Sequence, residues 1–314
     1  MQNIENIKQA IELTIDKFQK DYGVKCKNEL ATLAFFHLIF FDILKDKLKD
    51  LNIKIERKTI VSNHIDKSPI VEFIDADGNK KRSELGDLFF VFKGKENVKA
   101  ILIQAKLKDK SYTQGSTRKE KFLYENWPEF EITKPILNSN EAWPSEYLLG
   151  RRDDEIRGID SYSRFLTFNL KTTPLIIKNN IETNTFSDFF SSFIDINNSK
   201  LGHPFLDKYE IRNGKIFYIL NDCLKERDTF FDWDTLCNWL LAYFDGRFFE
   251  NKEVRGGGSK QIPTLLNFTA NGSYLIENTV LNSFNSFRDN YEENENYDLR
   301  FFSLIEISFE DSGI

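Results

Sequence analysis

The stretch ELGDLFFVFKGKENVKAILIQAKLKD, residues 84–109, decides how this chain is expected to fold. It contains two apolar runs separated by the turn-forming segment KGKEN, which predicts two neighbouring antiparallel strands. Asp87 stands at the start of the first run, and Gln104 and Lys106 stand at the end of the second. Because antiparallel pairing places the start of one strand beside the end of the other, these polar groups are expected to meet at one edge of a sheet.

The alternation of side chains along a strand indicates which of these groups share a face. Gln104 and Lys106 are two residues apart and point to the same face, whereas Ala105 points to the opposite one. The side chain of Ala105 can therefore pack in the core while its carbonyl oxygen stays available as a ligand. Hydrolysis of a phosphodiester with Mg²⁺ needs oxygen ligands at a fixed position and a cation near the attacking water or scissile phosphate. Asp87, Gln104, the Ala105 carbonyl and Lys106 are the residue types that this chemistry requires.

Hydrophobic periodicity predicts further elements around these two strands. We expect helices over residues 3–20, 28–51 and 119–125, and strands over residues 53–61, 70–74, 87–92 and 99–105. The helix over residues 28–51 is apolar nearly all round, so it and its His37 are expected to lie in the core. Asp77 and Gly78 predict a tight turn after the strand that ends at residue 74.

A connecting segment rich in turn signals, EAWPSEYLLGRRDDEIRG, follows these elements and predicts a domain boundary near residue 135. Residues 1–135 are the expected catalytic domain, and residues 136–314 are an expected α+β accessory domain that binds DNA or a partner. In the accessory domain we expect helices over residues 188–194, 234–243 and 278–289, and strands over residues 215–220 and 299–309. The glycine-rich segment at residues 255–260 is expected to be a flexible surface loop.

The charge of the chain is unevenly distributed. The net charge is -6, yet residues 1–135 carry 25 Lys and Arg against 21 Asp and Glu, whereas residues 136–314 carry 18 against 28. Residues 104–121 alone hold six basic side chains against two acidic ones. This segment is interpreted either as a patch that faces phosphates or as a solvated face. The candidate DNA-binding residues are Lys108, Lys110, Arg118, Lys119 and Lys121.

In this order of helix, strands, Asp87, 16 intervening residues, Gln104, Lys106 and helix, the sequence resembles the PD-(D/E)XK nuclease superfamily over about residues 25–130. The resemblance implies an α/β fold with a restriction-endonuclease-like mixed sheet flanked by helices. Two positions depart from the family motif: Gly86 stands in place of proline, and Gln104 stands in place of an acid. The glutamine form resembles the Mrr-like branch of restriction enzymes. That branch implies a helical acid as a further participant, and Glu29 is the matching position.

The function that the resemblance implies is a DNA endonuclease dependent on Mg²⁺ or Mn²⁺, in bacterial antiviral defence or restriction. Asp87, Gln104 and the Ala105 carbonyl would bind the metal, and Lys106 would orient or deprotonate the attacking water. Two alternatives stay open: a DNA-binding module that keeps the fold without catalysis, and a regulatory subunit whose acidic, aromatic second half binds another protein. The expected partners are DNA, another protein subunit of a defence system, or a second copy of this chain.

Other classes of site and location are disfavoured by the sequence. The three cysteines form no CxxC pair and the three histidines are scattered, which argues against a disulfide framework, a zinc site, an HNH-type nuclease and a Ser-His-Asp triad. No GxxxxGK[ST] motif is present. Because no apolar run approaches the roughly 18 to 20 residues of a membrane span and the first residues do not read as a secretory signal, we expect a cytoplasmic protein with no membrane contact.

Overall fold

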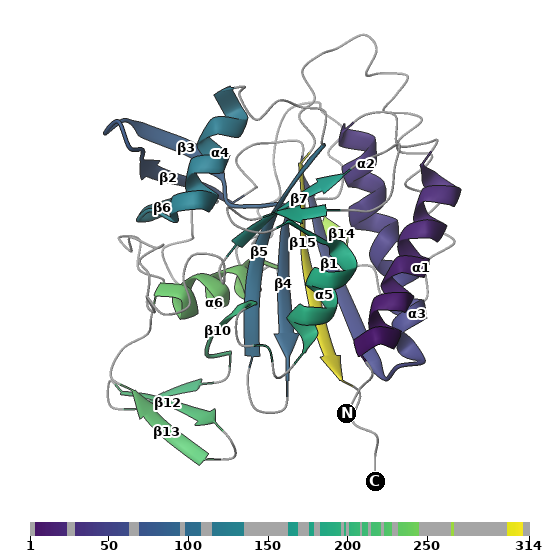
Figure 1. The fold of residues 1–314 in the computed structure, drawn as a ribbon. Helices are drawn as coiled ribbons and strands as arrows, with labels where there is room; N and C mark the ends of the chain where they lie inside the picture. The colour runs from purple at the N-terminus through teal and green to yellow at the C-terminus, as the bar shows by residue number, and fades with distance from the viewer. Residues whose placement is uncertain are drawn as a thin grey trace, which may run out of the picture.

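A computed structural model shows how the chain folds (Figure 1). It describes residues 4–23, 29–62, 69–94, 98–107, 115–134, 163–168, 176–178, 183–195, 198, 201–207, 209–212, 215–220, 223–227, 232–244, 265–266 and 300–309. Within these residues the fold is mixed α/β, with a large mixed sheet flanked by helices. No helix among the described residues is both long enough and apolar enough to cross a membrane.

The described residues form several helices, one large sheet and two small sheets. The helices are α1 (Ile4–Tyr22), α2 (Glu29–Phe35), the π-helix η1 (Phe36–Phe40), α3 (Phe41–Lys49), α4 (Gly115–Asn126), α5 (Phe186–Ile194) and α6 (Asp232–Phe244). The large sheet runs in the order β14 (Leu265–Leu266), β1 (Ile53–Ser62), β15 (Arg300–Phe309), β4 (Leu88–Lys93), β5 (Val98–Leu107), β7 (Ser163–Phe168), β8 (Ile176–Lys178) and β9 (Thr183–Thr185), with β10 (His203–Pro204) paired to β5. The small sheets are β3 (Lys80–Glu84), β2 (Ile70–Ile74) and β6 (Phe130–Lys134), and β11 (Tyr209–Arg212), β12 (Lys215–Leu220) and β13 (Cys223–Arg227).

The two strands predicted from residues 84–109 are confirmed. β4 and β5 are adjacent and antiparallel, with Leu88 opposite Ile103. The chain then continues through α4, and β7 returns parallel to β5 on its other side. Asp87, which directly precedes β4, is thereby placed beside the end of β5, as the antiparallel pairing predicted.

The long strand β15 lies between β1 and β4 (Figure 1, yellow). It is antiparallel to β1 along its whole length and parallel to β4. The large sheet therefore contains strands from both residues 1–135 and residues 136–314, with β15 between β1 and β4, so a boundary at residue 135 does not divide the chain into separate sheets.

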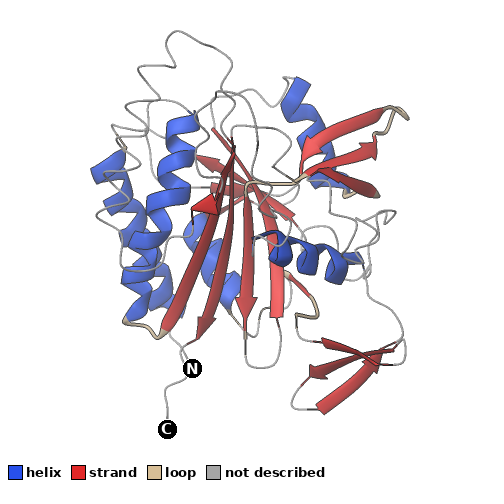
Figure 2. Cartoon of the chain, turned by 180° about the vertical axis from the view of Figure 1, so that it is seen from behind, coloured by secondary structure: helices blue, strands red, loops and turns tan. Residues whose placement is uncertain are grey.

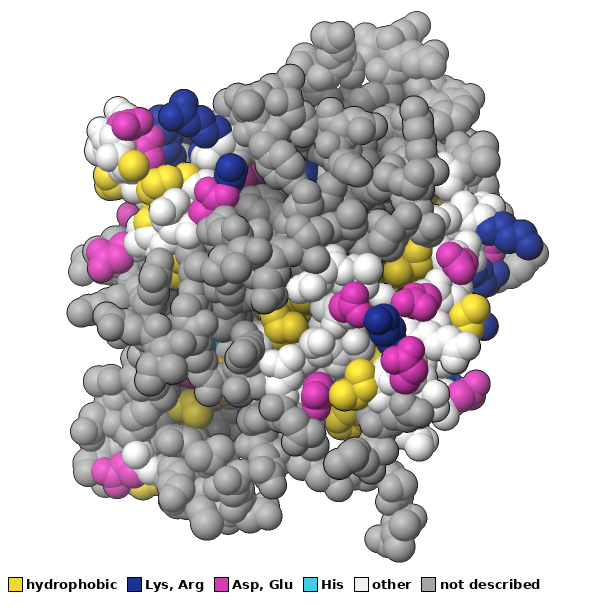
Figure 3. Space-filling model, in the orientation of Figure 1, with side chains coloured by type: hydrophobic (Ala, Val, Ile, Leu, Met, Phe, Trp, Pro, Cys, Tyr) yellow, Lys and Arg dark blue, Asp and Glu magenta, His cyan; other side chains and the backbone are white. Residues whose placement is uncertain are grey.

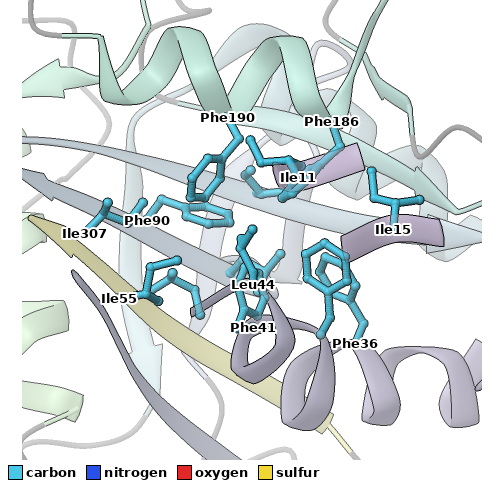
Figure 4. Close-up of a cluster of buried hydrophobic side chains, with 14 of the residues drawn as sticks. Ile11, Ile15, Phe36, Phe41, Leu44, Ile55, Phe90, Phe186, Phe190 and Ile307 are labelled. Carbon is cyan, nitrogen blue, oxygen red and sulfur yellow. The ribbon is translucent and has the colours of Figure 1, made fainter. Parts of the chain in front are cut away.

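Each face of the large sheet carries its own hydrophobic core. On one face, α1, α2, η1, α3 and α5 cover the sheet, and a cluster that includes Phe36, Leu44 and Phe186 packs there (Figure 4). On the other face, a second cluster packs beneath α4, α6 and the sheet of β2, β3 and β6. Figure 2 shows this face of the sheet from behind. Strand β4 supplies Phe90 to the first cluster and Phe89 to the second. Its run is continuously apolar because both of its faces are buried.

The helix predicted over residues 28–51 is observed as three consecutive helical elements. α2 passes into the π-helix η1 and then into α3, a local change that the hydrophobic pattern did not indicate. All of η1 is buried, which confirms the prediction of a buried helix for this part. In α3, Asp46, Lys47 and Lys49 are exposed, so the helix predicted as apolar nearly all round has a solvent face at its end. His37 is buried, and its Nδ1 lies 2.8 Å from Ser303 Oγ, which confirms it as a core histidine.

The turn predicted at Asp77 and Gly78 is confirmed and joins β2 to β3. Asp75 Oδ1 accepts hydrogen bonds from the backbone N–H groups of Asp77 (3.0 Å) and Asn79 (2.9 Å). Gly78 has φ 77°, a left-handed conformation that glycine adopts without strain. The following strand β3, KKRSE, was not predicted, because it lacks apolar alternation.

Most of the elements predicted beyond residue 115 are also observed. α4, α5, α6, β12 and β15 occupy the predicted positions within a few residues, and α4 begins earlier than the predicted residue 119. The sequence did not predict the strands β6 to β11, β13 and β14. The helix predicted over residues 278–289 and the loop over residues 255–260 lie outside the described residues.

Candidate functional site

The backbone of Asp87 is held by a neighbouring strand on each side. Its N–H donates to the carbonyl oxygen of Ile103 in β5 at 2.9 Å, and its own carbonyl oxygen accepts from the N–H of Ser303 in β15 at 3.0 Å. The residue is 8% exposed. Its position at the start of β4 is therefore set by both neighbouring strands of the large sheet.

The carboxylate of Asp87 accepts hydrogen bonds from two of the residues predicted on β5. Its Oδ2 accepts one hydrogen bond from Gln104 Nε2 and another from the backbone N–H of Ala105, both at 2.6 Å. The side chain of Ala105 points into the core on the opposite face of the sheet. The structure thus brings together Asp87, Gln104 and the Ala105 backbone.

Gln104 has one amide atom without a hydrogen-bond partner among the described residues. Its side chain is buried and its Nε2 is used by Asp87, but its Oε1 is buried and accepts no hydrogen bond from the part of the chain that the structure describes. A buried acceptor in this state costs free energy unless a donor or a cation satisfies it. The site therefore presents an oxygen suited to a cation next to a carboxylate.

Lys106 is paired with a residue that the sequence did not single out. Its Nζ lies 2.8 Å from Oε2 of Glu120 in α4, and the side chains of Lys106 and Glu120 are 20% and 7% exposed. Periodicity predicted a helix here, but Glu120 stood among Lys119 and Lys121 and was interpreted only as part of a charged segment. The packing of α4 on the sheet decides that Glu120 faces inward, and no signal in the local sequence identified that face.

A second residue of α4, one helical turn after Glu120, contacts the segment that leads into Asp87. The hydroxyl of Tyr124 donates to the carbonyl oxygen of Leu85 at 2.7 Å. A Cβ atom at Gly86 would lie 2.5 Å from this hydroxyl. Glycine at position 86 thus has a physical reason here, because a Cβ atom would displace the Tyr124 hydroxyl from its contact with Leu85.

Burial dominates the electrostatics of the site. It raises the pKa of the Asp87 carboxyl well above its ordinary value; the positive charge of Lys106 opposes this shift, and the carboxylate of Glu84 adds to it. The Ala105 N–H lowers the pKa of Asp87, and Glu120 raises it. Burial likewise raises the pKa of the Tyr124 hydroxyl, with the negative charges around it adding to the shift. The surroundings of Asp87 are rich in carboxyl groups, so a bound cation would be favoured there.

The predicted DNA-binding residues are only partly placed by the structure. Lys108 and Lys110 lie outside the described residues. On α4, Arg118 is exposed and Lys119 is half-buried, and Lys121 Nζ lies 3.4 Å from Glu125 Oε1. These three residues belong to the helix that carries Glu120 into the site, so they lie on the same element as part of the candidate site.

Strand β3 adds basic residues beside α4 that the sequence did not assign to the site. α4 packs against β3, and Lys and Arg side chains gather over these two elements with acidic side chains among them (Figure 3). Arg82 Nε lies 3.0 Å from Glu72 Oε1, and Lys80 pairs with the same carboxylate. The basic surface is therefore partly neutralised by acids of its own small sheet.

Glu29, the predicted helical participant, is the first residue of α2, and its side chain lies outside the described residues. Within the described ranges, no group of three or more His, Cys, Asp and Glu side chains could hold a metal ion. The candidate ligands are instead one carboxylate, one amide oxygen and one backbone carbonyl.

The comparisons with known proteins leave the geometry as the guide to function. No family model matches the chain, no curated protein matches it, and no solved structure matches it.

Proposed function

We propose that this chain is a metal-dependent DNA endonuclease with a restriction-endonuclease-like core. The observation that carries the proposal is the convergence of Gln104 and Ala105 on Asp87 Oδ2, with the buried Gln104 Oε1 left without a partner among the described residues. A purely structural cluster has no evident use for such an acceptor, whereas a cation-binding site needs one.

The topology around the site supports the same proposal. Helical elements precede the strands, β4 and β5 are antiparallel, α4 follows β5, and β7 lies parallel to β5. This is the order of helix, strands and helix on which the resemblance to PD-(D/E)XK nucleases rests. The proposed setting is bacterial antiviral defence in the cytoplasm, with the chain acting as a homodimer or beside another protein subunit.

The residues present fit a hard divalent cation. The Asp87 carboxylate, the Gln104 amide oxygen and the Ala105 carbonyl would hold Mg²⁺ or Mn²⁺, since such ions take oxygen ligands. A metal ion in such a site polarises the phosphoryl oxygens and lowers the pKa of a bound water. Glu29 is proposed as a further participant from α2.

Side chains of the chain itself would supply the other requirements of catalysis, which are orientation of the attacking water and stabilisation of negative charge. Lys106 carries its ammonium group two residues after Gln104 on the same face, where it would orient the attacking water and offset the negative charge that develops on the phosphate. The hydrophobic core below Asp87 and the packing of α4 exclude water from one side of the site, which strengthens these electrostatic interactions. Exposed basic residues of α4, such as Arg118, would contact the DNA backbone.

A cleavage assay tests the proposal. The purified protein is incubated with supercoiled and linear DNA in Mg²⁺, in Mn²⁺ and in EDTA, beside Asp87→Asn and Lys106→Ala. We expect cleavage by the wild type in either metal, none in EDTA, and none by either variant. An absence of metal-dependent cleavage, or equal rates for wild type and Asp87→Asn, would overturn the proposal.

A DNA-binding module without catalysis is the second candidate, and one observation favours it. Asp87 already accepts two short hydrogen bonds and Lys106 already pairs with the carboxylate of Glu120, so these two charged groups have partners without any metal or DNA. Salt-titrated binding to DNA, measured on protein that shows no cleavage, would support this candidate.

A further inference from the structure

We propose that Glu120 is the positioning residue of the candidate site and fixes the ammonium group of Lys106 beside Asp87. This inference rests on the function proposed above and adds a residue to it. Glu120 is buried in α4, and its Oε2 lies 2.8 Å from Lys106 Nζ. A buried carboxylate is retained at a cost in desolvation, so it is expected where a nearby cation compensates it.

A lysine at a strand end is mobile unless something holds it, because its side chain is a flexible four-carbon stem. Lys106 lies at the end of β5 and is 20% exposed, so it could turn toward solvent. The contact with Glu120 restrains it on the face of the sheet that Gln104 shares. Restraint of a charged group before the reaction is the usual means by which an enzyme lowers the cost of reorganisation.

Helix α4 is itself held against the sheet, which fixes the position of Glu120 relative to Lys106. One turn after Glu120, Tyr124 donates to the Leu85 carbonyl, and Gly86 leaves room for that contact. The carbonyl oxygen of Tyr124 also accepts a hydrogen bond from Ser163 Oγ in β7 at 3.5 Å. The same face of α4 therefore touches the segment before β4 through Tyr124 and the end of β5 through Glu120, and it sets both parts of the site relative to each other.

Glu120→Gln, Glu120→Asp and the matched control Glu125→Gln test this role. Glu125 lies on the same helix and also pairs with a lysine, Lys121, but with its side chain 32% exposed. The first readout needs no activity: the folded proteins are treated briefly with acetic anhydride, and peptide mass spectrometry gives the acetylation rate of Lys106 relative to the exposed Lys20. We expect a several-fold faster reaction of Lys106 in Glu120→Gln, an intermediate rate in Glu120→Asp, and the wild-type rate in Glu125→Gln.

The second readout is DNA cleavage in Mg²⁺, separated into kcat and KM. Mutation of a residue that positions a metal ligand lowers activity by about 10- to 100-fold. By analogy, we expect a decrease of this size in kcat for Glu120→Gln, with KM nearly unchanged and partial recovery in Glu120→Asp. Unchanged acetylation of Lys106 in Glu120→Gln would overturn the inference, even where the wild type cleaves DNA. A wild type that cleaves no DNA would overturn the proposed function, while the acetylation rates would still decide whether Glu120 positions Lys106. If Glu120→Gln does not fold, the same readouts on Glu120→Asp decide.

Discussion

The backbone carbonyl of Asp87 accepts a hydrogen bond from the backbone N–H of Ser303, a residue far along the chain, at 3.0 Å. The side chain of Ser303 is fully buried, and its Oγ lies 2.8 Å both from His37 Nδ1 and from Thr59 Oγ1. Asp87 is therefore connected through β15 to the helical layer on the opposite face of the sheet, and this connection leads to the first prediction.

Ser303→Ala should destabilise the fold but leave the candidate site competent. The change leaves the hydrogen-bonding groups of His37 and Thr59 short of a partner in the core, at a cost of about 1–3 kcal/mol, while the N–H that holds Asp87 remains. Chemical denaturation and cleavage rates check both parts. Ser308→Ala, on the same strand and half-buried, is the control and should change stability less. A variant as stable as the control would show that the Ser303 side chain carries no such role.

Stability should fall with acid because of His37. Burial lowers the pKa of His37 from 6.5 to about 3, and the positive charge of Arg57 adds to the shift. The unfolded chain binds a proton near pH 6.5 that the folded chain does not, so this contribution to stability is present above that pH and is lost as the pH falls toward 3. Denaturation of wild type and His37→Asn between pH 7.5 and 4 should show a flatter pH dependence in the variant. If the stability of wild type and His37→Asn changed with pH in the same way, His37 would not be the cause of the pH dependence.

Asp87→Asn should be more stable than the wild type at neutral pH without metal. Burial raises the pKa of Asp87, so the contribution of this carboxyl to the stability of the wild type is lost as the pH rises through the raised pKa. An amide at this position does not ionise and avoids this loss. Thermal melts in EDTA should show a higher melting temperature for the variant, and added Mn²⁺ should stabilise only the wild type. Asp75→Asn is a control of opposite sign, because the Asn79 N–H lowers the pKa of Asp75. A less stable Asp87→Asn would contradict the reasoning.

Gln104 is where metal binding and a structural role predict opposite outcomes. If its Oε1 contacts a metal, Gln104→Glu supplies a charged oxygen in nearly the same shape and should tighten Mg²⁺ binding, whereas Gln104→Ala should lose it. If it is only a buried polar residue, the new carboxylate repels Asp87 and lowers stability. Calorimetric Mg²⁺ titration and melts with and without metal separate the two. A Gln104→Glu protein that melts lower and gains nothing from Mg²⁺ would remove the metal site.

Neutralising the basic residues of α4 should weaken DNA binding and its dependence on salt. The slope of log K against log salt falls by about 0.9 for each phosphate that the protein no longer neutralises. Replacing Arg118, Lys119 and Lys121 together with glutamine should therefore lower both affinity and slope. Replacing Lys17 and Lys20 of α1, on the other face of the sheet, is the control. If the α4 variant bound DNA with the same affinity and the same salt slope as the wild type, this surface would be only a solvated face.

The local sequence determined the elements that meet at the site. The two apolar runs and the short turn segment between them sufficed to predict β4 and β5 as an antiparallel pair, because hairpin register depends on residues close together in the chain. The alternation of side-chain direction along a strand placed Gln104 and Lys106 on one face and the Ala105 side chain on the other. The meeting of Asp87 with Gln104 could therefore be predicted without any knowledge of the rest of the fold.

Only the tertiary structure decided which distant residues complete the site. The pattern of residues 299–309 predicted a strand, but its place between β1 and β4 depends on pairing between segments far apart in sequence, which periodicity does not encode. The sequence also did not predict which face of α4 packs on the sheet, because charged residues lie all around the helix. Packing alone buries Glu120. The requirement for glycine at position 86 also depends on tertiary structure. It arises from the close approach of the Tyr124 hydroxyl, which is a consequence of how α4 packs.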